Sequence, residues 1–212
     1  MDVRDILLFI ASLVNLGFSS TIVFKSPRNR INIGYGLSVV STALWTMGLA
    51  MFRLADPVYA VPWARFYYIA AGLIATYFLY FGIYFPRNEE RRFSLWQHVL
   101  LHLPIVIISY LVFSPSFLEG FRLQSWGKEI ILGPAYLFYV LFWVAYMGTA
   151  FFLMLSRFPK ANPLERLQLK FVLIGTLIAA TGGSIFNLFL PLTGNYRYIW
   201  GGPYSTLIMV IA

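Results

Sequence analysis

The stretch WARFYYIAAGLIATYFLYFGIYF, residues Trp63–Phe85, decides the fold class of this chain. Arg65 is its one charged residue, and the stretch matches the roughly 20 residues that a helix needs to cross a bilayer. Apolar runs recur on both sides of it. The seven predicted spans are Ile6–Phe24, Ile31–Phe52, Trp63–Phe85, Trp96–Phe113, Pro134–Leu155, Phe171–Leu190 and Ile199 to the end of the chain.

All seven runs are predicted to be helices. A lone strand leaves backbone groups unpaired in lipid, and the alternating pattern of a membrane barrel is absent. The sequence therefore predicts an all-α, polytopic integral membrane protein, a seven-transmembrane-helix bundle in a single domain of residues 1–212. The last run is several residues short of a crossing. We expect the chain to be truncated there, the alternative being a natural end in a short helix.

The composition supports the same class. Hydrophobic residues make up 59% of the chain and charged residues 11%, against about 45–50% and about 25% in a soluble domain. A soluble fold would not cover so much apolar surface, so the expected partner is the lipid bilayer, in the plasma membrane. The net charge of +8 lies in short clusters between the runs, which indicates topology and not nucleic-acid binding. The absence of cysteine excludes disulfides and thiolate sites.

Lysine and arginine are unevenly divided between the two sides of the predicted bundle. The positive-inside rule places the richer side in the cytoplasm, so the N-terminus is predicted outside and the C-terminus inside. The longest connection, about residues 114–133, is then external, and its composition predicts a short hairpin or an amphipathic lid. The richer side has Lys25, Arg28, Arg30, Arg87, Arg91, Arg92, Arg157, Lys160, Arg166 and Lys170, and the other has Arg4, Arg53, Arg65, Arg122, Lys128 and Arg197.

The sequence lacks the groups that most membrane chemistry requires. All acidic residues lie at predicted helix ends or in loops, whereas ion-coupled transporters and proton pumps usually need an ionisable group at mid-membrane. The last helix has no lysine for a retinal Schiff base. Metalloprotease, serine-hydrolase, phosphate-loop and kinase motifs are absent. We therefore expect no catalytic residue, no cofactor and no enzymatic activity in this chain alone.

A few polar side chains remain within the predicted spans. His98 and His102 share one face of the fourth helix, and without a third ligand nearby they favour hydrogen bonding over a metal site. Asn15 and Asn187 would leave an amide unsatisfied in lipid, so both are expected to face the bundle. For Asn15 a hydrogen bond to another helix is favoured. For Asn187, helix packing and ligand contact both remain open.

Small residues spaced by four form two stripes, and such stripes are typical of close helix contacts. They predict packing and not chemistry. The stripes consist of Gly34, Ser38 and Thr42, and of Gly175, Ala179 and Gly183.

Arg65 is predicted to lie in the first turn of the third helix, where the helix dipole disfavours a cation. Asp56 in the preceding loop can supply the anion that it needs. Alternatively, Arg65 belongs to an aromatic and basic mouth that opens outward between the second, third, sixth and seventh helices and suits an acidic or polar-headed ligand. Aromatic residues at this depth also occur as a simple interfacial belt. The predicted ligand-binding residues are Arg65, Trp63, Asn187, Tyr196, Arg197 and Trp200, with Tyr67 beside them.

Several segments, in order along nearly the whole chain, resemble a known family. They are Asn32, Trp45 in LWTMGLAMFRL, WARFYY from Trp63, Phe81 in YFLYFGIYFP, Gly133-Pro134, RLQLKFVLIGTLIA from Arg166, FNLFLPL from Phe186, and Pro203. The family that they resemble is the N-terminal seven-transmembrane region of membrane sensor histidine kinases, a region also found ahead of some diguanylate cyclases.

The resemblance implies an input domain of a two-component signalling receptor. Such a domain senses an unknown small ligand or membrane signal from outside and passes it through the last helix to a cytoplasmic kinase or cyclase module, which this chain does not supply. Histidine kinases of this type work between paired subunits, so a homodimer is expected. The family offers no shared catalytic residues. A small transporter or channel, and a membrane-embedded enzyme, remain as alternatives.

Overall fold

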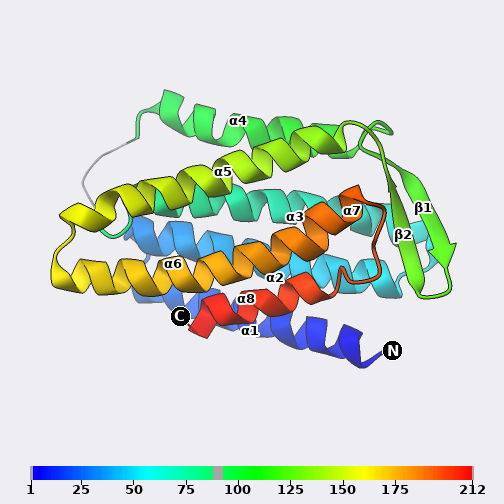
Figure 1. Ribbon diagram of the computed structural model, residues 1–212, viewed down its shortest axis with the longest axis horizontal. Coiled ribbons are helices and arrows are strands. Elements are labelled where there is room, and N and C mark those ends of the chain that lie inside the picture. The colour runs from blue at the N-terminus through cyan, green and yellow to red at the C-terminus, as the bar shows by residue number, and fades with distance from the viewer. Residues whose placement is uncertain (1, 88–92, 212) are drawn as a thin grey trace.

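The computed structural model describes residues 2–87 and 93–211, with side chains as far as Leu207. Long helices lie side by side, and successive helices run in opposite directions (Figure 1). Six of them are long and apolar enough to cross a membrane. The seventh predicted span is present as α8, whose 11 residues are fewer than one crossing needs. The helices are α1 (Val3–Lys25), α2 (Arg30–Leu54), α3 (Pro57–Tyr84), α4 (Leu95–Val112), α5 (Tyr136–Arg157), α6 (Pro163–Ser184) and α8 (Gly201–Ile211).

The connections gather at the two ends of the bundle. At one end, called the hairpin end, lie the N-terminus, the α2–α3 turn, a β-hairpin and the loop of residues 193–200 (Figure 1). The opposite end, called the basic end, carries the described residues of the larger predicted basic group. These are Lys25, Arg28, Arg30, Arg87, Arg157, Lys160, Arg166 and Lys170. Arg91 and Arg92 of the same predicted group lie outside the described residues.

α2 and α3 form the centre of the bundle, and about half or more of each helix is buried. Glycines bring the two helices together: a Cβ on Gly34 would lie 3.0 Å from the Cα of Phe81, and one on Gly48 would lie 2.9 Å from the Cβ of Tyr67. Since neither place has room for a methyl group, the α3 side chains pack directly on the α2 backbone. α1 packs on α2, while α4 and α5 pack on α3. We call α1–α5 the scaffold.

α6 is attached to the bundle differently. It continues through a π-helical turn, η2 (Ile185–Phe189), into the short α7 (Leu190–Leu192). Its main partner is α8, where the Ser205 hydroxyl lies 3.0 Å from the Ala179 carbonyl of α6 and 2.6 Å from the Gly202 carbonyl of its own helix, so its single proton serves one or the other. A Cβ on Gly182 would lie only 2.5 Å from the Cβ of Ser205, so these backbones are also close. α6 has few contacts with α5. We call α6, η2, α7 and α8 together the α6–α8 pair.

The connection between α4 and α5 contains a β-hairpin of two antiparallel strands, β1 (Leu118–Gln124) and β2 (Gly127–Leu132). The fold is therefore mostly helical, and the all-α prediction is wrong in this segment. Backbone N–H and C=O groups outside a helix still need hydrogen-bond partners, and here each strand supplies them to the other. Lys128 fixes the hairpin to α2 by donating to the carbonyls of Phe52 and Arg53 at 3.0 and 2.9 Å.

The third helix begins at Pro57 and not at Trp63. Proline suits the first helical position because its missing N–H would be unpaired there anyway, and Pro62 then lies inside the helix. Arg65 is therefore beyond the first turn, so the dipole argument for an anionic partner does not apply to it. Arg65 forms no ion pair with Asp56 among the described residues and donates to the Phe113 carbonyl at 3.3 Å.

Two further polar predictions concern helix interiors. Asn15 is buried, as predicted, but its amide donates to the Ala11 carbonyl of its own helix at 2.8 Å, so the prediction of a bond to another helix is wrong. The carbonyl four residues earlier is the nearest acceptor for such a side chain. In the same way, His102 Nδ1 lies 2.9 Å from the carbonyl of His98 within α4.

Candidate functional site

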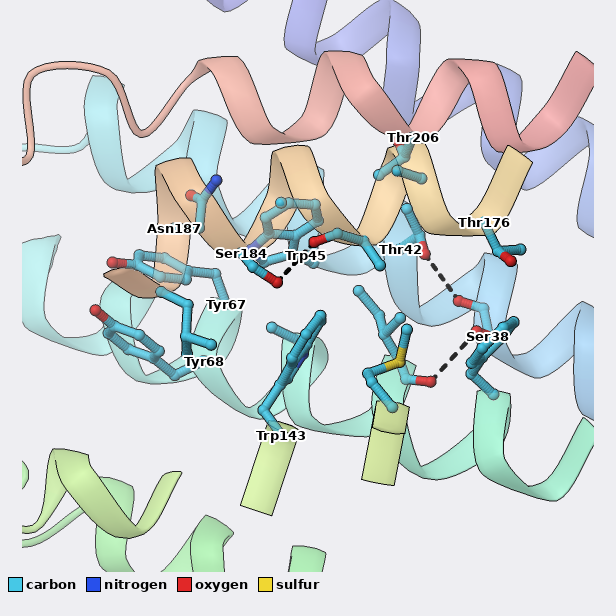
Figure 2. Close-up of a pocket in the computed structure, with 18 of the residues that line it drawn as sticks. Ser38, Thr42, Trp45, Tyr67, Tyr68, Trp143, Thr176, Ser184, Asn187 and Thr206 are labelled. Atoms are coloured by element: carbon cyan, nitrogen blue, oxygen red, sulfur yellow. Dashed lines mark hydrogen bonds between the residues drawn. The ribbon is translucent and has the colours of Figure 1, made fainter. Parts of the chain in front are cut away.

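A cavity of about 60 Å³, called the central pocket, lies where the scaffold meets the α6–α8 pair. α2 and α3 form its floor, α5 forms one wall, and α6 with η2 forms the other (Figure 2). None of the described residues that line it carries a charge. Its polar and large aromatic residues are Ser38, Thr42, Trp45, Tyr67, Tyr68, Tyr139, Trp143, Thr176, Ser184, Asn187 and Thr206.

Most hydroxyl protons around the pocket are already used within their own helices. Thr42 donates to the Ser38 carbonyl at 3.0 Å, and Ser184 donates to the Ala180 carbonyl at 2.6 Å. Thr176 and Thr206 make bonds of the same kind to carbonyls three or four residues earlier. Such hydroxyls offer a ligand their oxygen lone pairs but no free proton.

Asn187 differs from these hydroxyls because it carries an unused donor. Its Nδ2 is buried and has no hydrogen-bond partner among the described residues. The π-helical turn η2 places Asn187 on the pocket wall, and such turns are frequent at functional sites. The Tyr136 hydroxyl of α5 reaches the carbonyls of Asn187 and Leu188 at 3.4 and 3.2 Å. A buried amide N–H without an acceptor costs about 1–3 kcal/mol, which a bound acceptor would offset.

Packed aromatic side chains separate the central pocket from the hairpin. The Tyr68 ring lies 5.3 Å from that of Phe117, 5.7 Å from that of Tyr136 and 5.5 Å from that of Tyr139, measured between centroids. Phe117, just before β1, brings the base of the hairpin into this cluster. We call the cluster the aromatic plug, and Tyr196 belongs to it as well. The Tyr196 hydroxyl is buried without a hydrogen-bond partner among the described residues. The plug closes the pocket toward the hairpin end.

The predicted ligand residues lie in several different places. Asn187 lines the central pocket, Tyr196 lines a cavity beside β2, and Trp63 lines a groove against α1 and α2. The Arg65 guanidinium lies 5.4 Å from the centroid of the Phe113 ring, next to the carbonyl to which it donates. Asn187, Tyr196 and Trp63 therefore each line a different cavity, and Tyr67, predicted beside them, lines the central pocket with Asn187.

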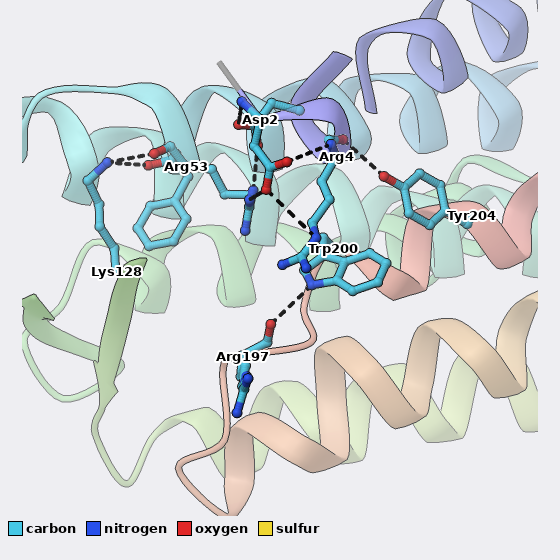
Figure 3. Close-up of polar contacts among 9 residues, drawn as sticks. Asp2, Arg4, Arg53, Lys128, Arg197, Trp200 and Tyr204 are labelled. Atoms are coloured by element: carbon cyan, nitrogen blue, oxygen red, sulfur yellow. Dashed lines mark hydrogen bonds and ion pairs between the residues drawn. The ribbon is translucent and has the colours of Figure 1, made fainter. Parts of the chain in front are cut away.

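Arg197 and Trp200 lie in the loop that precedes α8 (Figure 3). The Trp200 indole donates to the Arg197 carbonyl at 3.1 Å, and the Arg4 guanidinium lies 4.8 Å from the centroid of the Trp200 ring. The Tyr204 hydroxyl donates to the Arg4 carbonyl at 2.9 Å. These contacts attach the start of α8 to the start of α1.

An ion pair at the same end was not predicted. Arg53 Nε of α2 lies 2.6 Å from Asp5 Oδ1 of α1, and a second contact joins Arg53 to Asp2 at 3.9 Å (Figure 3). The pair ties α1 to α2 beside the start of α8. Asp5 and Arg53 are separated by the whole of two helices in the sequence, so only the antiparallel packing brings them together.

A family model described as the N-terminal 7TM region of histidine kinase matches residues 7–211, from the first helix through α8. The chain belongs to this family. Comparisons with curated proteins and with solved structures gave no match. Membership in the 7TM region of histidine kinases, together with six apolar helices, makes this chain the sensor region of a multi-pass membrane protein.

In this histidine kinase 7TM region, two arginines fix the basic end. Arg157 of α5 donates to three carbonyls at the end of α3, over 2.5–2.7 Å, and so neutralises the negative end of that helix dipole. Arg87 binds both carboxylate oxygens of Glu165 on α6, at 2.9 and 3.0 Å. Both arginines therefore hold the helices together below the central pocket. The carbonyls that Arg157 binds belong to Gly82, Ile83 and Phe85.

The small-residue stripes mark the pocket that the sequence did not predict. Gly34 makes the predicted close contact with α3. Further along the stripes, Ser38 and Thr42 of α2 and Ala179 and Gly183 of α6 all line the central pocket. Small side chains on both sides leave space instead of closing it. Two such stripes on separate helices are the sequence signal that could have located the pocket.

Proposed function

We propose that this chain is the non-catalytic sensory input domain of a two-component receptor. In this proposal it detects a ligand or a state of the membrane and relays it through α8 to a cytoplasmic histidine kinase or cyclase module. The observation that carries the proposal is the division of the bundle into a tightly packed scaffold and an α6–α8 pair, with the central pocket between them. Membership in the histidine kinase 7TM family supports the same role.

The proposed orientation places the hairpin end outside and the basic end in the cytoplasm. The ten-to-six excess of lysine and arginine favours this orientation. α8 starts at the hairpin end and runs toward the basic end (Figure 1). A displacement of α8 would therefore be transmitted toward the side on which the output module is expected.

The proposed relay is a shift of the α6–α8 pair against the scaffold. α6 and α8 approach closely at Gly182, and Ser205 of α8 contacts the Ala179 carbonyl of α6, whereas α6 has few contacts with α5. A ligand in the central pocket touches both parts at once. It shifts the equilibrium between two arrangements only to the extent that it binds one of them more tightly, at about 1.4 kcal/mol for each factor of ten.

The active unit is proposed to be a homodimer, because histidine kinases phosphorylate between paired subunits. The outer faces of α4 and α6 are apolar, and contact with lipid or with a second copy would cover them equally well. Cross-linking at native-like protein density in lipid tests this point, and a strictly monomeric state would count against it.

The relay is tested by linking the two walls of the pocket. The chain has no cysteine, so Met147→Cys on α5 and Ala180→Cys on α6 can be joined by a bifunctional thiol reagent in the full-length receptor. We expect the link to fix autophosphorylation at one level whatever the stimulus, and cleavage of the linker to restore the response. The control pair Ser12→Cys and Ala43→Cys joins α1 to α2 within the scaffold and should leave the response intact. A normal response after complete linkage of α5 to α6 contradicts the proposal.

A further inference from the structure

α5 and α6 both line the central pocket but have few contacts with each other. At the basic end they are joined by the turn of residues 158–162, and at the hairpin end by the Tyr136 hydroxyl on the η2 carbonyls. We call the region between these two points the α5–α6 slit.

The slit borders apolar surface on both sides. Leu141 and Val144 of α5 are exposed, and so are Ile174, Leu177 and Ile178 of α6. In a membrane-spanning bundle such side chains face lipid. The aromatic plug packs between the pocket and the hairpin end, and Met147 of α5 and Ala180 of α6 line the pocket on the two sides of the slit.

We propose that the central pocket binds a neutral, membrane-dissolved molecule that has an apolar body and a carbonyl-type hydrogen-bond acceptor, and that enters from the bilayer through the α5–α6 slit. The signalling consequence of this inference rests on the proposed function, whereas the binding itself does not.

The chemistry of the lining selects this class of ligand. None of the described side chains that line the pocket is charged, and an ionised group moved into it would lose its hydration without a counter-charge from them. The hydroxyl protons of Thr42 and Ser184 are engaged with their own helices. Among the described residues that line the pocket, Asn187 carries a buried donor without a partner, its Nδ2, which lies against Gly202 of α8. An ester or ketone oxygen beside it forms a hydrogen bond that a hydrocarbon cannot form. Trp45 and Trp143 supply broad apolar walls for the body of the ligand.

Because the pocket is small, a ligand can enter it only if α6 moves away from α5. The pocket volume of about 60 Å³ is well below the roughly 150 Å³ of an engineered apolar cavity that admits benzene. An acyl or ring-containing ligand therefore fits only when the slit widens. Because α6 is joined to α8 through Ser205 and Gly182, widening the slit carries α8 with it.

Tryptophan fluorescence gives a direct test of binding. A variant that keeps Trp143, with phenylalanine at the other tryptophan positions, is reconstituted in phosphatidylcholine vesicles and titrated with a fatty acid methyl ester brominated at mid-chain. A brominated alkane of the same length is the probe without an acceptor. We expect saturable quenching of Trp143, with half-saturation at about tenfold lower ester than alkane, the factor for one neutral hydrogen bond.

In the matched control variant, Trp96 is the only tryptophan that remains. It lies on α4 and is 74% exposed. Its quenching should rise without saturation, equally for both probes, because it senses only probe dissolved in the bilayer. Non-saturating quenching of Trp143 would overturn the inference, and so would equal half-saturation by ester and alkane.

Two substitutions locate the site. Asn187→Leu should remove the preference for the ester and keep saturable binding, while Asn15→Leu, which removes a buried amide remote from the pocket, should change neither. If Asn187→Leu does not fold, Ala180→Phe replaces it: the phenylalanine side chain fills the slit, so saturable quenching of Trp143 should disappear.

A preference for the ester that survives both variants overturns the assignment of the site. Saturable binding without any change in autophosphorylation contradicts the proposed function and leaves the binding site standing.

Discussion

The α2–α3 contact and the α6 side of the central pocket are built from the same kinds of residues and have opposite outcomes. Gly34 of α2 faces Tyr80 and the backbone of Phe81, so a large side chain fills the room that glycine leaves. Along the same stripe, Thr42 lines the central pocket together with Gly183 of α6, and the room stays open. Small residues permit close contact, but the residue opposite decides whether contact or a cavity results.

This difference assigns stability to one region and movement to the other. The scaffold has direct packing at α2–α3 and charge-assisted bonds at its basic end, whereas the α6–α8 pair borders empty volume. Substitutions in the scaffold should therefore change the free energy of unfolding, and those at the α6–α8 pair should change signalling output more than stability. The five predictions below begin with the largest expected effect on stability.

Replacing Arg157 with methionine should lower the free energy of unfolding by about 3 kcal/mol, because hydrogen bonds from a charged group contribute roughly 1.5–3 kcal/mol and three carbonyls of α3 lose their partner. Chemical unfolding in lipid nanodiscs measures the change. Lys170→Met removes an exposed cation of α6 and serves as the control. Equal effects of the two variants would contradict the role of Arg157.

Gly34→Ala should destabilise the protein by about 1–3 kcal/mol, because the new methyl group would lie 2.8 Å from Tyr80 and 3.0 Å from the Phe81 backbone. Gly17→Ala on α1 is the matched control, since nothing lies within 4 Å of its added Cβ. That control should be neutral or stabilise by up to about 1 kcal/mol through helix propensity. Thermal unfolding compares them, and similar shifts for both would show that α2–α3 packing is looser than described.

Gly182→Ala should cost about 1 kcal/mol or less of stability and change the basal autophosphorylation of the parent receptor. The added methyl group lies 2.5 Å from the Cβ of Ser205, and α6 can relieve the overlap by moving into lipid, at a cost near the low end for overpacking. Adding Ser205→Gly, which removes the opposing side chain, should restore the basal output. Unchanged output in the single variant would mean that α6 and α8 do not relay as a unit.

Lys128→Met should weaken the attachment of the hairpin to α2 by about 1 kcal/mol, since two hydrogen bonds from a partly solvated ammonium group are lost. Hydrogen exchange of the β1 and β2 amides measures the change. Arg122→Met, an exposed cation of the same hairpin, is the control. Equal exchange in both variants would assign the attachment to other contacts.

Lys128 also predicts a pH dependence. Desolvation lowers the pKa of Lys128 from its ordinary value of 10.5, despite the nearby Asp56. As pH rises from the lowered pKa toward 10.5, the folded state has released its proton while the unfolded state still holds it, so the free energy of unfolding increases with pH in that window. Lys128→Met should abolish this slope. A slope that persists in the variant would belong to another group.

The sequence predicted the spans well because length and hydropathy are local properties. α1 and α4 begin and end close to the predicted residues. The start of α3 was missed because Pro57 and Pro62 both resemble helix-breaking residues. Proline is in fact favoured at the first helical position, where α3 has Pro57. The strand pairing of the hairpin depends on register, and a sequence of this composition left hairpin and lid equally open.

The site was harder to predict because a cavity depends on which helix faces meet. Asn187 was predicted to face the bundle because its amide would lack hydrogen-bond partners in lipid, and it does line the central pocket. Arg65 was selected because the third helix was predicted to begin at Trp63, whereas it begins at Pro57. Trp143 and Thr176 carry no local signal, since an aromatic or hydroxyl side chain in an apolar helix looks the same toward lipid, a neighbour or empty space.

The π-helical turn Ile185–Phe189 contains the equivalent of one residue more than an α-helix of the same course. Loss of a single codon in this segment would close the turn into a regular α-helix, which keeps both flanking helices in their relative orientation and changes only which side chains of the turn face the pocket. Asn187 would then leave the pocket wall, and another side chain would replace it. Relatives that differ by one residue at this point would thus share the fold and recognise different molecules, so gain or loss of that residue offers a short evolutionary route to a new stimulus.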